Sequence, residues 1–180
     1  MTGESFESML TGGHPNSLER TVDVVDAVSA APERFADLFG CYSSGDPVVR
    51  LRTSNGMKRL AAQRPELLVP YIDRFLQQVG AIDQASAQWT LAQIFDALSQ
   101  SMTVKQRASA RALMQRNLVE STDWIVLSMT MKTLTHWAAG DRGLAEWLRP
   151  RLRSLSQDER RSVAKCAGKM LATLERPVPG

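Results

Sequence analysis

Two amphipathic segments follow one another between residues 46 and 80, and they constrain the fold of this chain more than any other stretch. Asp46 followed by Pro47 is typical of a helix start, because the carboxylate accepts backbone N–H groups and proline needs no hydrogen bond there. An apolar stripe at helical spacing then leads to Pro65, which ends one helix and suits the first turn of the next. The second stripe ends at Gly80, a natural helix stop. Neither helix can bury its stripe alone, so the stretch predicts an antiparallel helix pair that packs against neighbours.

Weaker copies of this pair precede and follow it. Potential first-helix starts recur 37, 40 and 35 residues apart, at Asp46, Asp83, Asp123 and Asp158. Capping boxes at Thr103 with Gln106 and at Ser156 with Glu159 indicate two further helix starts, since each side chain can accept the other residue's free N–H. No stretch of useful length shows strand-like alternation, so the sequence predicts an all-α fold.

The 46–80 stretch resembles a known repeat in two segments, Asp46-Pro47-Val48-Val49-Arg50 and Pro65-Glu66-Leu67-Leu68. Both are similar to a HEAT or armadillo-type repeat of the small bacterial kind, and the likeness extends more weakly over nearly the whole chain. It implies a right-handed α-α superhelix, a HEAT/ARM-like solenoid of about four helical hairpins plus terminal helices, with the second helices lining one face. The expected organisation is a short helix and linker over residues 1–16, one repeat domain over 17–175 and a flexible tail over 176–180.

Inside the expected helices, two prolines predict bends or loosened turns, and four basic residues predict a face exposed to solvent. Pro70 and Pro150 fall inside second helices, where a proline bends the helix or loosens its first turns. In the first helix of the 46–80 pair, four basic side chains lie mostly off the apolar stripe and are expected to face solvent: Arg50, Arg52, Lys58 and Arg59.

Composition places the chain among ordinary globular proteins, with 43% apolar residues. No apolar run is long enough to suggest a membrane span, and the first ten residues lack the basic-then-apolar pattern of a leader. Cys41 and Cys166 show no ligand spacing and are expected to be buried free thiols. These features together predict a cytoplasmic protein that does not contact a membrane.

Charge is spread unevenly, although the net charge is only +3. Residues 1–48 hold eight acidic and two basic side chains, whereas residues 149–176 hold eight basic and three acidic ones. A molecule polarised in this way can steer an acidic partner toward its C-terminal end.

The sequence carries no recognisable catalytic motif. It lacks the HExxH, CxxC, GxSxG, Walker and GxGxxG patterns, and it has two histidines, His14 in an expected turn and His136 on an expected helix. We therefore expect no enzymatic activity, no cofactor and no metal site.

Six side chains are the candidate binding residues. Basic residues of the second helices lie off the apolar stripes, and Trp147 replaces the aliphatic Leu67 of the matching repeat position. Trp89 and Trp137 fall on core stripes instead, and Trp124 begins a helix at an edge. The candidate set is Arg74, Arg107, Arg111, Arg149, Arg153 and Trp147. The last helix adds a row spaced four residues apart, at Arg161, Lys165 and Lys169.

These residues favour a non-enzymatic protein-binding scaffold that uses a concave, partly basic helical-repeat surface. The partner would carry an acidic or amphipathic segment, because arginine and lysine bind carboxylates.

The alternative is binding of a DNA or RNA backbone through the same groove. Some HEAT-like proteins are DNA alkylation-repair glycosylases, which use an aromatic residue and an acid in a basic groove. Tyr71 with Asp73, or Trp147, are the nearest candidates here, but the residues of that family's site do not match position by position. A lyase or chaperone-like role for a tetrapyrrole or other cofactor, known among HEAT-like proteins, would need an exposed aromatic pocket.

Overall fold

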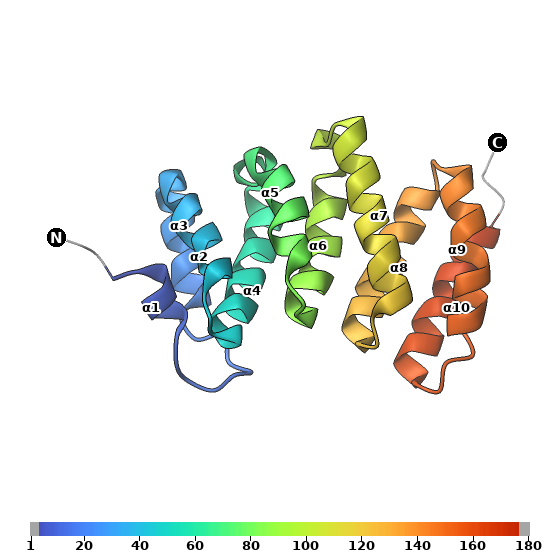
Figure 1. Cartoon of the computed structure of the whole chain (residues 1–180), viewed down its shortest axis with the longest axis horizontal. Helices are drawn as coiled ribbons and strands as arrows, with labels where there is room; N and C mark the ends of the chain where they lie inside the picture. Colours follow the sequence, from blue (N-terminus) through green and yellow to red (C-terminus); the bar gives the residue numbers. More distant parts are fainter. Residues whose placement is uncertain (1–3, 177–180) are drawn as a thin grey trace. The chain divides into compact units, whose positions relative to one another are not determined.

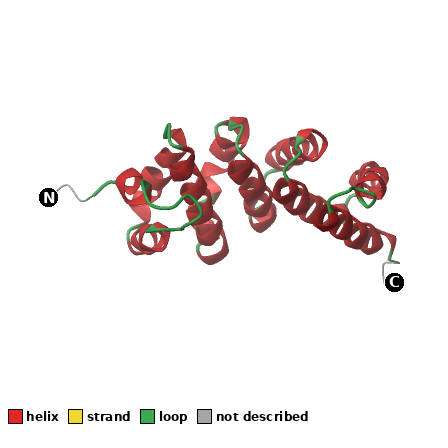
Figure 2. Ribbon diagram, turned by 90° about the horizontal axis from the view of Figure 1, so that it is seen from below, coloured by secondary structure: helices red, strands yellow, loops and turns green. Residues whose placement is uncertain are grey.

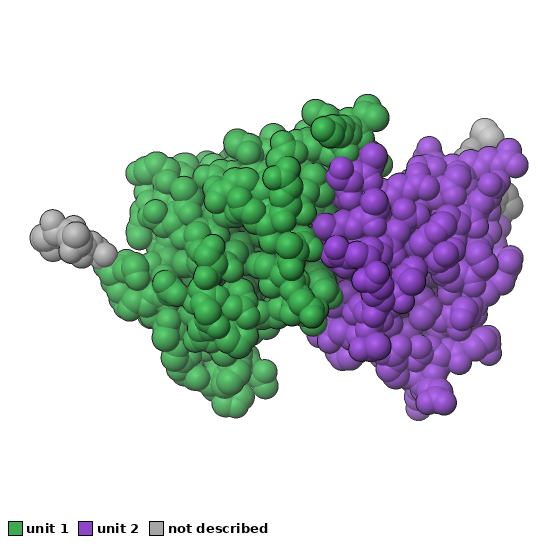
Figure 3. All heavy atoms as spheres, in the orientation of Figure 1, with its two compact units in different colours: residues 1–107 green, residues 108–180 purple. Residues whose placement is uncertain are grey.

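The computed structural model describes residues 4–176, and within that range the chain forms α-helices and short 3-10 turns with no strand (Figures 1 and 2). The all-α expectation is therefore confirmed for the described part. Of the expected tail, residues 177–180 lie outside the described range. The chain divides into two compact units, unit 1 over residues 1–107 and unit 2 over residues 108–180 (Figure 3).

Over its described residues, 4–107, unit 1 holds six helices and the first residues of a seventh. The helices are α1 (Phe6–Leu10), α2 (Thr21–Ala30), α3 (Phe35–Gly40), α4 (Pro47–Gln63), α5 (Ile72–Gln77) and α6 (Ala85–Ala97). Six 3-10 turns accompany them, at Pro32–Arg34, Cys41–Ser43, Pro65–Leu67, Val69–Tyr71, Val79–Ala81 and Ser99–Ser101. The division between the units falls inside α7 (Val104–Glu120). Unit 2 continues with α8 (Trp124–Ala138), α9 (Arg142–Leu155) and α10 (Arg161–Glu175).

Three helix starts, at Asp46, Thr103 and Asp123, follow the predicted capping chemistry. The Asp46 carboxylate accepts the Val48 N–H at 2.8 Å, with Pro47 at the first helical position. Thr103 and Gln106 form the predicted reciprocal pair, at 3.0 and 3.2 Å. Each of these contacts satisfies an N–H that the helix itself leaves free.

Two predicted starts are wrong. Ser156 and Glu159 form no capping box: the Ser156 hydroxyl donates to the Arg153 carbonyl, and α10 begins later. The Asp158 carboxylate instead accepts the Arg160 N–H at 2.9 Å, which holds the preceding turn. Similarly, Asp83 is not the helix start: α6 begins at Ala85, with Gln84 at the N-cap position and no side-chain capping hydrogen bond.

The prolines act as expected in the 46–80 pair. After Pro65 the chain makes two 3-10 turns, the second containing Pro70, before α5 begins at Ile72. Pro150 lies inside α9 without ending it. Proline thus loosens the first turns of one second helix and is accommodated within the other.

Unit 1 is built around α4, which packs against α1, α2 and α6. A ring cluster joins α3 to the α5 region: Phe39 lies 5.1 Å from both Tyr71 and Phe75, and Phe35 lies 4.6 Å from Tyr71, between ring centroids. These tilted and edge-on contacts add specific geometry to the apolar core.

The prediction that four cations of α4 face solvent is wrong. Arg52 is fully buried, with 0% of its surface exposed, and Arg50, Lys58 and Arg59 are half-buried. The Arg52 guanidinium donates to four backbone carbonyls, those of Leu10, Gly12, His14 and Ser17, at 2.6 to 3.0 Å. It fixes the loop between α1 and α2 against α4, because a planar guanidinium offers several donors in a fixed fork.

In unit 2, α8 packs against α9, and α10 packs against both. The core is the predicted apolar face of α8 with Leu144, Leu148 and Leu152 of α9 and Val163 of α10, all buried. Trp137 is buried as predicted, at 4% exposure. Trp89 of unit 1 is only half-buried, with the Lys58 ammonium 5.3 Å from its ring centroid, so its expected place in the core is not observed.

Candidate functional site

Unit 2 carries the positive charge of the molecule. It holds twelve lysine and arginine residues against seven aspartate and glutamate residues, whereas unit 1 holds ten against twelve. Unit 2 therefore has a formal charge of +5 and unit 1 a formal charge of −2. A surface that attracts acidic groups is thus expected on unit 2.

The sequence of α9 places three arginines on one side of the helix. Arg142, Arg149 and Arg153 are seven and four residues apart, a spacing that returns to the same face. Arg142 pairs with Glu146 at 2.9 Å and Arg153 with Glu175 of α10 at 3.2 Å. Arg149 is half-buried and has no hydrogen-bond or ion-pair partner among residues 4–176. Two members of the candidate set, Arg149 and Arg153, are therefore brought together here.

Trp147 lies on another side of α9. The Arg151 guanidinium stacks over its ring, 3.9 Å from the centroid, and donates to the Trp147 carbonyl at 2.8 Å. The ring is half-buried beneath this cation. Because Trp147 and Arg149 are two residues apart, they point to nearly opposite sides of the helix. Trp147 and the arginine face therefore do not form one site.

Arg111 of α7 is engaged within unit 2. Its guanidinium binds the Asp141 carboxylate at 2.6 Å, and the same carboxylate caps α9 by accepting the Leu144 N–H at 2.8 Å. This bridge joins α7 to the start of α9. Arg111 therefore positions α9, and its charge is already compensated by Asp141.

The remaining two candidate residues belong to unit 1. Arg74 stacks on Phe39, 4.3 Å from the ring centroid, and on Tyr71 at 5.3 Å. Arg107 donates to the Ser99 carbonyl at 3.3 Å. Both contacts attach the cation to its own unit and leave part of each side chain exposed.

The aromatic and acidic candidates for a glycosylase site are also engaged in packing. Tyr71 belongs to the ring cluster with Phe35 and Phe39, and the Asp73 carboxylate accepts the Gln106 amide at 3.1 Å. Asp73 thereby joins the α5 region to the start of α7. Neither residue stands alone in a hollow.

The last helix presents a row of cations to solvent. Arg161, Lys165 and Lys169 are exposed and have no ion-pair or hydrogen-bond partner among the described residues. The buried residues of α10, Val163 and Ala167, lie on its opposite side. We call these three cations the α10 row.

A cavity of about 620 Å³ lies in unit 2, where the end of α8, the start of α9 and the end of α10 meet. We call it the interhelical cavity. Arg142, Arg149 and Arg176 supply its cations, and Asp141 is its acid. Sequence reasoning identified Arg149 but missed Thr135 of α8, which lines the cavity with a buried hydroxyl that has no hydrogen-bond partner among the described residues. The signal available was the run Thr130, Thr133 and Thr135 within an apolar face, which is unusual for a buried helix.

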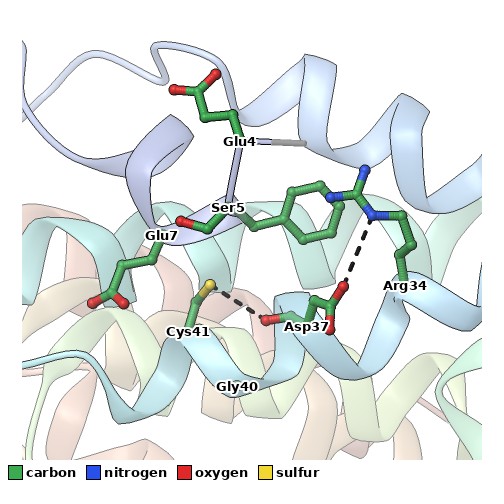
Figure 4. Close-up of a pocket in the computed structure, with 8 residues that line it drawn as sticks. Glu4, Ser5, Glu7, Arg34, Asp37, Gly40 and Cys41 are labelled. Carbon is green, nitrogen blue, oxygen red and sulfur yellow. Dashed lines mark hydrogen bonds and ion pairs between the residues drawn. The ribbon is translucent and has the colours of Figure 1, made fainter. Parts of the chain in front are cut away.

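A second hollow, of about 380 Å³, lies in unit 1 beside α1 and α3 (Figure 4). The Arg34 guanidinium lies 3.9 Å from the Phe6 ring centroid and 3.8 Å from the Asp37 carboxylate. The Cys41 thiol donates to the Asp37 carbonyl at 3.5 Å, and burial raises the pKa of Cys41 to about 11. A thiol with so high a pKa stays protonated, so this hollow contains no activated nucleophile.

Among residues 4–176, no group of three or more His, Cys, Asp or Glu side chains is arranged to hold a metal ion. Over the same range, none of the helices has both the length and the apolar character needed to cross a membrane. Comparison with protein-family models, with curated proteins and with solved structures found no match.

Proposed function

We propose that this protein is a non-enzymatic binding module, a HEAT-like helical-repeat scaffold that recognises an acidic segment of a partner protein through the basic surface of unit 2. The observation that carries the proposal is the α10 row, three exposed cations without a partner in the described part of the chain. Like charges four residues apart on a helix repel one another and reduce its stability. Folding therefore gains nothing from this row, which favours an intermolecular role.

The all-helical pairs and their capping support a repeat scaffold, since such proteins place function in surface side chains rather than in the fold. Both cysteines are free thiols, a state that a reducing compartment such as the cytoplasm preserves. We propose the cytoplasm as the place where the partner is met.

Nucleic-acid binding through the same cations is the alternative. Bases bind to exposed aromatic faces, and in unit 2 Trp137 is buried while Arg151 covers Trp147. Trp124, at 51% exposure, is the one tryptophan of that unit left open. This scarcity of stacking surface favours an acidic peptide over a nucleic acid.

Fluorescence anisotropy tests the proposal with two labelled probes, an oligoglutamate peptide and a single-stranded oligonucleotide of matched length. The variant Lys165→Gln/Lys169→Gln should weaken oligoglutamate binding about fivefold to tenfold, as expected for the loss of two exposed ion pairs. The control Lys105→Gln/Lys132→Gln removes the same charge from exposed positions on α7 and α8 and should bind as the wild type does.

Equal binding by both variants would contradict the proposal, because affinity would then follow net charge alone. Tighter binding of the oligonucleotide, lost in the α10 variant, would instead support the alternative. In that case log affinity should fall steeply and linearly with log salt concentration.

A further inference from the structure

The interhelical cavity combines apolar walls with a cluster of guanidinium groups. Ala138 and Ala139 of α8, Ala145 of α9 and Leu174 of α10 form the apolar part of its lining. Its volume of about 620 Å³ falls within the range of small-molecule sites. The cavity is therefore large enough for an organic ligand and is suited to one with an apolar body.

The charge available in the cavity is positive. Of the residues that line it, Asp141 is the sole acid, and its carboxylate is already bound by Arg111 and by the first turn of α9. Arg142 contacts Glu146, but Arg149 and Arg176 have no ion-pair or hydrogen-bond partner among residues 4–176. Two guanidinium groups thus remain for an anion, which they bind with paired donors.

Thr135 provides an independent sign of a ligand. Its side chain is 4% exposed and lines the cavity, and its hydroxyl has no partner among the described residues. A buried hydroxyl without a hydrogen bond is unfavourable, so the position favours a group that can accept or donate one.

We propose that the interhelical cavity binds a small amphipathic organic anion, with its acidic head on Arg149 and Arg176 and hydrogen-bonded to Thr135, and its apolar body against the alanines of α8 and α9. The head group is a carboxylate or a phosphate, which present the same oxygen acceptors to arginine. The site is distinct from the α10 row, and it does not depend on the binding of an acidic partner.

Isothermal titration calorimetry of the full chain with octanoate, octyl phosphate and octanol tests the proposal. Both anions should bind and octanol should not, and the better of the two anions identifies the head group. Arg149→Gln should weaken anion binding about tenfold, the usual effect of losing one charge-assisted contact.

Two further variants examine the other walls. Thr135→Val keeps the shape of the side chain and removes one hydrogen bond, so it should weaken the binding of both anions about threefold to tenfold. Ala139→Leu places bulk in the cavity from an exposed position and should abolish binding. Lys132→Gln, on an exposed part of α8, is the charge control and should leave binding unchanged.

Octanol binding as tightly as octanoate, or wild-type affinity in both Arg149→Gln and Ala139→Leu, would overturn the proposal. Circular dichroism verifies that each variant is folded. Because Lys165→Gln/Lys169→Gln should bind octanoate normally, and Thr135→Val should bind oligoglutamate normally, failure of this proposal is distinguishable from failure of the proposed function.

Discussion

The two units differ in how far their cations are engaged by the rest of the chain. In unit 1, Arg50, Arg52 and Arg64 donate to backbone carbonyls of preceding segments, at Ser44, at four positions between Leu10 and Ser17, and at Ser29. In unit 2, Arg160 makes a contact of this kind with the Thr122 carbonyl. Several other cations of unit 2 have no partner in the described part of the chain, namely Lys132, Arg149, Arg161, Lys165, Lys169 and Arg176.

The number of basic residues therefore does not by itself locate a binding surface. A guanidinium that already satisfies carbonyls has few donors left for a partner, and its burial makes it part of the fold. Arg50, Arg52 and Arg64 of unit 1 are therefore structural, whereas Arg149, Arg176 and the α10 row of unit 2 are available for ligands.

Removal of the Arg52 guanidinium should have the largest effect. Arg52→Met keeps much of the side-chain volume but leaves the carbonyls of the α1–α2 loop without donors, so we expect a loss of about 3–4 kcal/mol in the free energy of unfolding. Urea denaturation followed by circular dichroism measures it. Arg149→Met in unit 2 is the matched control, with an expected change within about 0.5 kcal/mol. Equal losses in the two variants would refute the contrast between the units.

The two cysteines should differ in reactivity. Cys41 of unit 1 is buried and its pKa is raised to about 11, so at mildly alkaline pH its thiolate fraction is about a hundredfold below that of an ordinary thiol. Cys166 of unit 2 is half-buried. Mass spectrometry after brief treatment with iodoacetamide should find Cys166 modified first, and equal or faster labelling of Cys41 would contradict this.

The raised pKa of Cys41 also makes the free energy of unfolding depend on pH. Because the folded state holds the Cys41 proton more tightly than the unfolded chain does, the contribution of this thiol to stability is complete below the ordinary thiol pKa of 9.0 and is lost as pH rises toward about 11. Cys41→Ala should reduce this loss of stability in the alkaline range. An unchanged alkaline profile in the variant would assign the loss to other groups.

Helix caps should contribute a similar amount to protein stability in both units. Asp123→Ala removes an acceptor of the Ile125 and Val126 N–H groups, and Asp46→Ala removes an acceptor of the Val48 N–H. Each change should cost about 1 kcal/mol, with the larger loss at Asp123 because it caps two groups. Replacement by asparagine should restore most of the stability, since its side-chain oxygen also accepts. A cost near zero at both positions would show that the caps do not control helix ends.

Neutralising the α10 row should have the smallest effect on stability and the opposite sign. Lys165→Gln relieves repulsion from both Arg161 and Lys169, so it should stabilise the protein by about 0.2–0.5 kcal/mol. Thermal unfolding at low salt measures this change, which should disappear at high salt as the charges are screened. Destabilisation by Lys165→Gln would indicate that the row supports the fold.

The sequence was sufficient to predict most helices because local chemistry fixes them. Asp46 with Pro47, Asp123, and Thr103 with Gln106 each satisfy their own helix start within four residues. At Ser156 the same reasoning failed, since Asp158 and Arg160 made a competing turn that delayed α10. Both outcomes depend on neighbouring residues in the chain.

Local sequence patterns did not predict the contacts between segments that are distant in the chain. Arg52 lies off the apolar stripe of α4, yet it is buried because its partners come from residues 10–17, which are 35 to 42 positions earlier in the chain. In the candidate site, the spacing of α9 predicted that Arg149 and Arg153 share a face. It could not predict that Arg111 is bound to Asp141, or that Thr135 lines a cavity with Arg149.

The central claim is that unit 2, through its outward cations, binds an acidic segment. Chemical-shift mapping tests it most directly: oligoglutamate is titrated into the isotope-labelled protein, whose mass of 19.9 kDa suits amide NMR. We expect shift changes concentrated on α10 and on the arginine face of α9, and their loss in Lys165→Gln/Lys169→Gln. Changes centred on α4 to α6 of unit 1, or none at a large excess of peptide, would contradict it.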